Sequence, residues 1–178
     1  IIFCGDLGFQ LPPIQGEEME VTDFDNITTL TKNYRIKCEK QTMICKKVRE
    51  MIKAKVEKNL INQFICESYG NVEVPENYKP QDIILCSRQD YCLEYTKKFG
   101  ETKWVCDKRN QNNNRGDISI GEKPEGKWLC RHGYTIHSVQ GETFEETIFI
   151  DSRNMFDSRM GYTAISRARY AHQIKILI

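Results

Sequence analysis

The longest uninterrupted apolar segments of this chain are only as long as a β-strand, and this limits the folds open to it. Residues 1–4 and 83–86 are two such segments, and 174–178 is a third that one Lys interrupts. A helix needs about 20 apolar residues to cross a bilayer, so no membrane-spanning segment is expected, and no signal peptide is visible. Short buried strands between helical segments instead predict an α/β protein.

The helical segments have the period of surface helices. Apolar residues recur every four positions between 38 and 65, which predicts one long or two consecutive amphipathic helices that end near Gly70. Further helices are expected to end at Gly100 and to cover 157–169. Strands are expected at 83–86, 103–106, 128–136, 147–150 and 174–178. The strand–helix–strand order over 83–106 predicts a βαβ unit, and therefore a parallel sheet with helices on both faces.

The 178 residues are enough for one domain, or for one domain and part of a second. The chain begins in a strand without Met, so we expect a fragment of a longer protein. The net charge is only +1, yet residues 35–60 hold nine bases and three acids, whereas 1–34 hold one base and six acids. The basic residues of the expected helix are Lys46, Lys47, Arg49, Lys53 and Lys55. They form either a solvated helix face or a path for phosphates.

Eight cysteines are present, and no two of them have the two-residue spacing of a zinc or thioredoxin motif. Several lie inside apolar segments, where Cys behaves as a small hydrophobic residue. We therefore expect reduced thiols in an intracellular protein, with disulfides as the alternative.

One segment imitates a phosphate-binding loop. Residues 121–127 fit the spacing GxxxxGK, but Trp128 stands where Ser or Thr would bind magnesium. Glu122 and Glu125 would also place carboxylates against the phosphates. No nucleotide is expected there, and the glycine pattern of a Rossmann fold is missing after every expected strand.

Four segments carry the chemistry of this chain. They are 5–13 (GDLGFQLPP), 33–35 (NYR), 133–143 (GYTIHSVQGET) and 162–169 (YTAISRAR). In this order and spacing they resemble motifs III to VI of the C-terminal half of superfamily 1 helicases. The likeness is nearest to the RecD-like 5′-to-3′ branch with its viral and transposon members. It implies a RecA-like parallel sheet of the P-loop NTPase type, with the end of a first RecA-like domain and a connector at 1–34 and the second RecA-like domain at 35–178.

The resemblance also implies what the intact protein binds. Members of this family hydrolyse ATP with Mg²⁺ and move along single-stranded DNA, and RNA remains an open alternative. Their phosphate loop and magnesium-binding Asp-Glu pair precede motif III, and neither is present here. ATP and Mg²⁺ are therefore expected to be held mainly by a missing first domain, which is the expected protein partner, and this fragment alone is expected to be inactive. No membrane partner is expected.

Gln10, Arg35 and Arg167 match the family's catalytic residues. Gln10 matches a glutamine that senses the γ-phosphate, and Arg35 and Arg167 match two arginines that reach the triphosphate from the second domain. Arginine suits this role because it is always charged and presents a planar fork of donors. Considered singly, Gln10 could be a turn residue, Arg35 an ordinary cation before a helix, and Arg167 a surface charge.

The third motif implies contacts with both ligands. Thr135, His137 and Thr143 match nucleic-acid-binding positions, where hydroxyl and imidazole groups can bond phosphate oxygens. Gln140 and Gly141 match nucleotide-binding positions, at an expected turn onto a helix whose end can hold an anion. Considered alone, His137 could be a satisfied core histidine.

Two nearby features stay open. Arg169 is expected to pair with either a local carboxylate or a DNA phosphate. Many relatives insert a small β-barrel between the helical part and motif V, whereas the polar residues 107–127 occupy that place here. A hairpin or a mobile insertion is expected there, and the barrel's role as a strand clamp is in doubt or falls to a hairpin.

A rival function from a different class is a catalytically inactive RecA-like module that binds nucleic acid or a partner protein. A phosphate loop followed by an Asp-Glu pair, encoded upstream of Ile1, would distinguish the helicase from this module.

Overall fold

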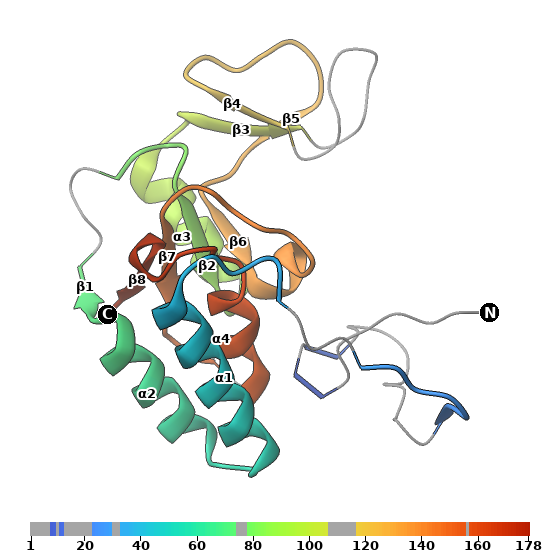
Figure 1. Ribbon diagram of the computed structural model, residues 1–178. Coiled ribbons are helices and arrows are strands. Elements are labelled where there is room, and N and C mark those ends of the chain that lie inside the picture. The colour runs from blue at the N-terminus through green and yellow to red at the C-terminus, as the bar shows by residue number, and fades with distance from the viewer. Residues whose placement is uncertain are drawn as a thin grey trace.

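The computed structural model of this chain is built around a five-stranded parallel sheet (Figure 1). It describes residues 8–9, 11–12, 23–29, 33–73, 78–106, 117–155 and 157–178. The strands of this sheet are β1 (Asn71–Val72), β2 (Ile83–Cys86), β6 (Gly133–Thr135), β7 (Ile148–Asp151) and β8 (Ile174–Leu177). Their order is β1-β8-β7-β2-β6, and every pairing is parallel. The predicted parallel sheet is therefore confirmed.

Helices cover both faces of this sheet. The helices α1 (Glu39–Lys53), α2 (Lys58–Tyr69) and α4 (Ser158–Ile165) contact one another and form one layer, while α3 (Gln89–Phe99) packs on β2 and β6. Since side chains alternate along a strand, Ile83 and Leu85 enter the core under α1, α2 and α4. Ile84 and Cys86 enter the core under α3. Both faces of β2 are thus buried, as expected for an internal parallel strand.

The amphipathic region 38–65 forms two helices rather than one. The chain leaves α1 at Ala54 and passes through Lys55, whose φ is 53°. The second helix, α2, ends at Gly70, whose φ of 76° few other residues adopt without strain. The predicted end near Gly70 is confirmed.

The βαβ unit predicted over 83–106 is wrong, because its last strand belongs to a second sheet. There β3 (Lys103–Cys106) lies between β4 (Ile118–Ile120) and β5 (Trp128–Cys130), and both pairings are antiparallel. Trp104, Cys106 and Trp128 form a small core of their own, which satisfies the apolar residues of β3 without the main sheet. Figure 1 shows this sheet standing apart from the parallel one.

The single strand predicted over 128–136 is also divided between the two sheets, as β5 and β6. The hairpin expected within 107–127 is confirmed to the extent that β4 pairs back onto β3. Residues 107–116 of that segment lie outside the described part of the chain.

Lys103 ties the small sheet to the parallel one. Its fully buried ammonium donates a hydrogen bond to the carbonyl oxygen of Asp82, just before β2, at 2.7 Å. The same nitrogen lies 5.3 Å from the ring centroid of Tyr134 in β6. Burial lowers the pKa of Lys103 from 10.5 to about 8.

No disulfide joins any two of the cysteines that the structure describes. Within the described ranges, no helix is both long enough and apolar enough to cross a membrane. In the same part of the chain, no group of three or more His, Cys, Asp or Glu side chains could hold a metal ion.

Gly133 permits the close approach of β6 to α3, so a side chain at this position should push the helix away. A Cβ atom on Gly133 would lie 2.7 Å from the Cα of Cys92. We predict that Gly133→Ala lowers the free energy of unfolding in urea by about 1–3 kcal/mol. The matched control is Gly161→Ala in α4, where the new Cβ would meet the flexible end of Ile65 and Ala is the better helix former. Equal losses for the two variants would contradict this explanation.

Lys103 should also give the protein a pH-dependent stability. Its pKa is about 8 in the folded protein and 10.5 in the unfolded chain, so between these values the unfolded state binds more protons and stability rises with pH. The full change is on the order of 3 kcal/mol. Lys103→Met removes this titration, so the unfolding free energy of the parent minus that of the variant should rise from pH 8 to pH 10.5. A difference that does not vary with pH would refute this.

Candidate functional site

Three segments that are distant in the sequence meet beside the start of α1. The amide of Lys37 donates to the carbonyl of Arg169 at 2.9 Å, and the amide of Phe144 donates to the carbonyl of Arg167 at 3.0 Å. Phe144 also forms an isolated parallel bridge with Ala168. The segments around 35, 142 and 167 are therefore fixed to one another by backbone hydrogen bonds. They belong to three of the four motifs.

Arg167 is fully buried directly after α4. Its Nε donates to the carbonyl of Thr163 at 2.9 Å, its Nη1 to the carbonyl of Glu142 at 3.0 Å, and its Nη2 to Ser166 Oγ at 2.8 Å. The helix predicted over 157–169 is too long, because α4 ends at Ile165. Arg167 consequently lies beyond the helix end, where its Nε bonds back to the carbonyl of Thr163 in α4. Burial also rules out the alternative of a surface charge.

Arg35 reaches the same place from the segment before α1. Its Nη1 donates to the carbonyl of Ser166 and its Nη2 to the carbonyl of Gly141, each at 3.4 Å. The turn that carries it is local: Asn33 Oδ1 accepts hydrogen bonds from the amides of Arg35 and Ile36, as Asn commonly does in turns. The structure therefore brings Arg35 and Arg167 together at Ser166 and the 141–142 turn.

The two guanidiniums form a concentrated positive charge. The pKa of Arg167 falls to about 10, first because of burial and second because of the like charge of Arg35, so Arg167 stays charged at neutral pH. The partners of both side chains are carbonyls and one hydroxyl. Among the described residues, no carboxylate forms an ion pair with either guanidinium. Two adjacent cations without a carboxylate partner suit an anion with several oxygens, such as the end of a triphosphate.

The residues of motif V lie on β6 and the segment after it. Thr135 is the N-cap of the short 3₁₀ helix η2 (Ile136–Val139), and its Oγ1 accepts a hydrogen bond from the amide of Ser138 at 3.3 Å. His137 is half-buried within η2, and burial lowers its pKa below the usual value. Its imidazole is therefore neutral at pH 7. Thr143 is half-buried in the loop that follows.

The turn onto a helix that was expected at Gln140 and Gly141 is wrong. The helical turn η2 precedes them, and Gly141, with a φ of 99°, directs the chain toward the bridge at Phe144. In the described part of this segment no helix begins after Gly141, so no helix N-terminus is available there for an anion. Gln140 instead donates from Nε2 to the carbonyl of Leu11 at 3.3 Å.

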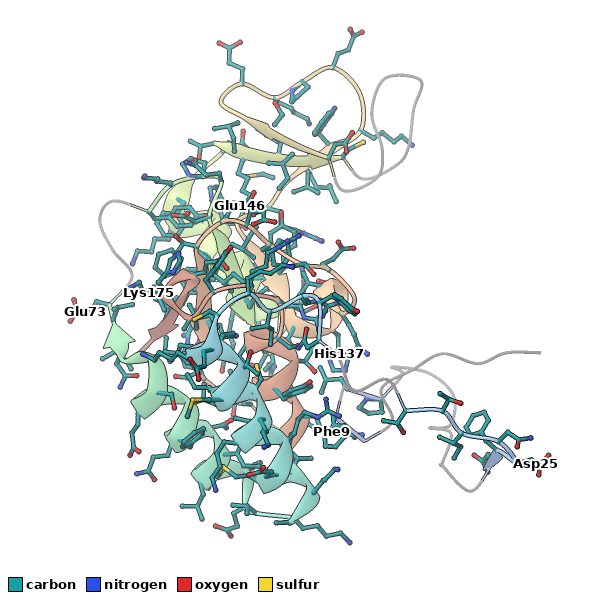
Figure 2. All side chains as sticks on the ribbon, viewed as in Figure 1. Phe9, Asp25, Glu73, His137, Glu146 and Lys175 are labelled. Carbon is teal, nitrogen blue, oxygen red and sulfur yellow. The ribbon has the colours of Figure 1, made fainter. Side chains whose placement is uncertain are left out.

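The first motif contacts α1 and α4 through Phe9, a residue that the sequence did not single out. Phe9 is buried beside the Tyr162 ring, with 6.2 Å between the two ring centroids. The guanidinium carbon of Arg49 lies 4.1 Å from the centroid of the Phe9 ring. Lys53 Nζ lies 5.4 Å from the same ring. The labelled Phe9 can be found in Figure 2 at the side of α1 and α4. Gln10, the residue expected to sense the γ-phosphate, lies outside the described residues.

These contacts change the interpretation of the basic helix face. Arg49 and Lys53 are four residues apart, and both lie over Phe9 within cation–π distance. Both side chains therefore contact the first motif through Phe9, in addition to whatever else this helix face binds. The signal available in the sequence was this basic pair at helical spacing together with an aromatic residue next to Gln10.

Arg169 pairs with a local carboxylate, which was one of its two expected partners. Its Nε lies 2.7 Å from Glu145 Oε1. The two neighbouring arginines of the last motif therefore differ in environment. Arg167 is buried among carbonyls, whereas Arg169 is partly exposed in an ordinary ion pair.

Comparison with known proteins relates the chain to one group of solved structures. No protein-family model and no curated protein matches it. A Bacteroides Pif1 helicase in complex with ADP-AlF3 and ssDNA is similar to it, with a TM-score of 0.64 at 16% identity, over 94% of this chain and 60% of that chain. A Pif1 helicase from a study of DNA unwinding at forked dsDNA gives 0.63 at 17% identity, over 94% and 58%. Candida albicans Pif1 gives 0.56 at 10% identity, over 76% and 53%.

The chain thus spans about three fifths of the length of the first two helicases. At these identities the likeness concerns the fold. The mostly parallel sheet with helices on both faces is the RecA-like α/β fold that the four motifs predicted, and it is shared with Pif1 helicases.

Proposed function

We propose that this chain supplies the second RecA-like domain, at 35–178, of an ATP-dependent helicase, preceded at 1–34 by the end of the first domain and a connector. The single observation that carries the proposal is the adjacent pair of Arg35 and Arg167 without a carboxylate partner. The likeness to Pif1 structures, one of them in complex with ADP-AlF3 and ssDNA, supports it. The intact enzyme would couple ATP hydrolysis to translocation on single-stranded nucleic acid and to duplex unwinding.

The chemistry follows from where charge develops. Hydrolysis of a triphosphate leaves negative charge on the γ-phosphoryl oxygens and on the bridging oxygen. Arg35 and Arg167 would stabilise that charge from the second domain, in surroundings where burial strengthens electrostatic interactions. Mg²⁺ would be held mainly by the first domain and would neutralise charge on the phosphates. Gln10 would report whether the γ-phosphate is present.

Translocation would follow from domain closure. When ATP draws the two RecA-like domains together, Thr135, His137 and Thr143 would shift along the strand, and release of products would reopen the cleft. The driving force is the difference in ATP affinity between the closed and open states. Gln140 would take part by linking this motif to the carbonyl of Leu11.

The finer assignments rest on the motifs alone. We propose that the protein belongs to the RecD-like branch with its viral and transposon members. We further propose that it binds single-stranded DNA, with RNA as the alternative, and that it acts inside cells. The second candidate is an inactive RecA-like module that binds nucleic acid or a partner protein. ATP hydrolysis by the full-length protein with and without single-stranded DNA separates the two. Stimulated hydrolysis supports the helicase, and none supports the module.

Arg167 should be needed for turnover but not for nucleotide binding. In the full-length enzyme, we predict that Arg167→Ala lowers kcat for ATP hydrolysis by about 10³-fold or more, as arginine fingers do. That corresponds to a loss of at least about 4 kcal/mol of transition-state stabilisation. Binding of a fluorescent ATP analogue should change little.

The matched control is Arg169→Ala, which removes a neighbouring arginine that pairs with Glu145. Its turnover should stay within about twofold of the parent, since an exposed ion pair contributes little. If Arg167→Ala retained hydrolysis within a few-fold of the parent, the role proposed for Arg167 would be wrong.

His137 should bind the strand as a neutral group, because its lowered pKa leaves it uncharged at pH 7. We predict that His137→Ala weakens single-stranded DNA binding about threefold to tenfold, as expected for one lost hydrogen bond. The dependence of the binding constant on salt should not change, because no counterion-releasing charge is removed. Fluorescence anisotropy at several salt concentrations measures both, and exposed His172 provides the control variant His172→Ala. A reduced salt dependence for His137→Ala would contradict a neutral contact.

A further inference from the structure

We infer that Gln41, held in place by Tyr69, is a positioning residue that sets the placement of Arg167 relative to Arg35. Gln41 lies in the first turn of α1, six residues after Arg35. It is fully buried, although an exposed polar residue would be expected near a helix start. The inference rests on the function proposed above for the two arginines.

The contacts of Gln41 connect three helices. Its Nε2 donates to the carbonyl of Ile165, the last residue of α4, at 2.7 Å. Its Oε1 accepts a hydrogen bond from the hydroxyl of Tyr69, the last residue of α2, at 2.7 Å. A weaker contact of 3.7 Å joins Nε2 to Cys45 Sγ one turn along α1. Both ends of the amide are thus satisfied, which fixes its orientation.

The carbonyl that Gln41 binds lies two residues before Arg167. Carbonyls at a helix end lack the hydrogen bond that the helix interior supplies. The only backbone partner of the Ile165 carbonyl in the described structure is the Ala168 amide, at a long 3.4 Å. The bond from Gln41 at 2.7 Å is therefore its main partner. The Gln41 bond thus fixes the C-terminal end of α4, to which the guanidinium of Arg167 is bonded through the carbonyl of Thr163.

Gln41 also completes a series of contacts between the two arginine-bearing segments. Arg35 donates to the carbonyl of Ser166, the Lys37 amide donates to the carbonyl of Arg169, and Gln41 donates to the carbonyl of Ile165. The first of these bonds is long, at 3.4 Å, and its donor is one of the proposed functional groups. The other two set the register of residues 37–41 against 165–169. Of these two, only Gln41 acts through a side chain, so a substitution can test it.

Tyr69 gives a mild way to disturb this arrangement. Its hydroxyl is the one group that holds the Gln41 oxygen, and Tyr69→Phe removes it without emptying space in the core. Tyr95→Phe is the matched control, because its buried hydroxyl donates to Asp151 Oδ2 at 3.1 Å in the core on the opposite face of the sheet. Both variants lose one hydrogen bond donated by a tyrosine hydroxyl, and only the bond of Tyr69 is connected to Arg167.

The experiment measures steady-state ATP hydrolysis of the full-length enzyme with saturating single-stranded DNA. We expect Tyr69→Phe to lower kcat about threefold to tenfold with an unchanged KM, because a displaced Arg167 weakens an interaction made only in the transition state. Tyr95→Phe should leave kcat within about twofold of the parent. Gln41→Met, which removes both polar contacts at similar volume, should lower kcat at least as much as Tyr69→Phe.

The decisive comparison is the effect of Tyr69→Phe on kcat in the parent enzyme and in the Arg167→Lys variant. If Tyr69 acts through Arg167, Tyr69→Phe should cause no further loss of kcat once the guanidinium is gone, because coupled residues are not additive. An equal loss in both backgrounds, or an effect of Tyr69→Phe no larger than that of Tyr95→Phe, would overturn the inference. If Arg167→Ala itself retains turnover within a few-fold, the proposed function of Arg167 fails, and the inference fails with it. The two failures are therefore distinguishable.

Discussion

The structure depends on two like charges being held side by side. Arg35 and Arg167 repel each other, and yet backbone carbonyls at 141, 142, 163 and 166 hold both guanidiniums in one place. Carbonyl dipoles stabilise a cation without neutralising it, so a net positive charge remains where a carboxylate would have cancelled it. Two segments, at 141–142 and 163–166, supply those carbonyls, and a third segment supplies Arg35. The parallel sheet is the scaffold that brings them together.

Much of this fold could be predicted because its signals are local. The periodicity of apolar residues predicts α1 and α2. Short apolar segments predict the buried strands β2, β7 and β8. The place of β3 was mispredicted because a four-residue strand of one lysine and three apolar residues fits either sheet. Its place was decided by the packing of its own Trp104 with Trp128 from β5, more than twenty residues away, and by the buried contact of Lys103 with the carbonyl of Asp82. Neither leaves a periodic signal in the sequence.

The candidate site could likewise be predicted only in part from the sequence. Motif spacing was sufficient to single out Arg35 and Arg167, and the structure brings them together. It could not show that α4 stops at Ile165, nor that η2 precedes Gln140, because both depend on how segments dock on the sheet. Gln41 was invisible for the same reason. Its partner Ile165 lies 124 residues away, and a single glutamine in a helix carries no pattern.

The burial of Phe9 and Leu11 affects how this protein can be dissected. Both side chains belong to the same core as α1 and α4, although the sequence assigns them to the segment before the second domain. A recombinant fragment that starts at residue 35 would leave solvent in contact with the apolar groups they cover, and would deprive Gln140 of the Leu11 carbonyl. The practical unit for expression is therefore longer than residues 35–178, because Phe9 and Leu11 are part of the core that α1 and α4 also form.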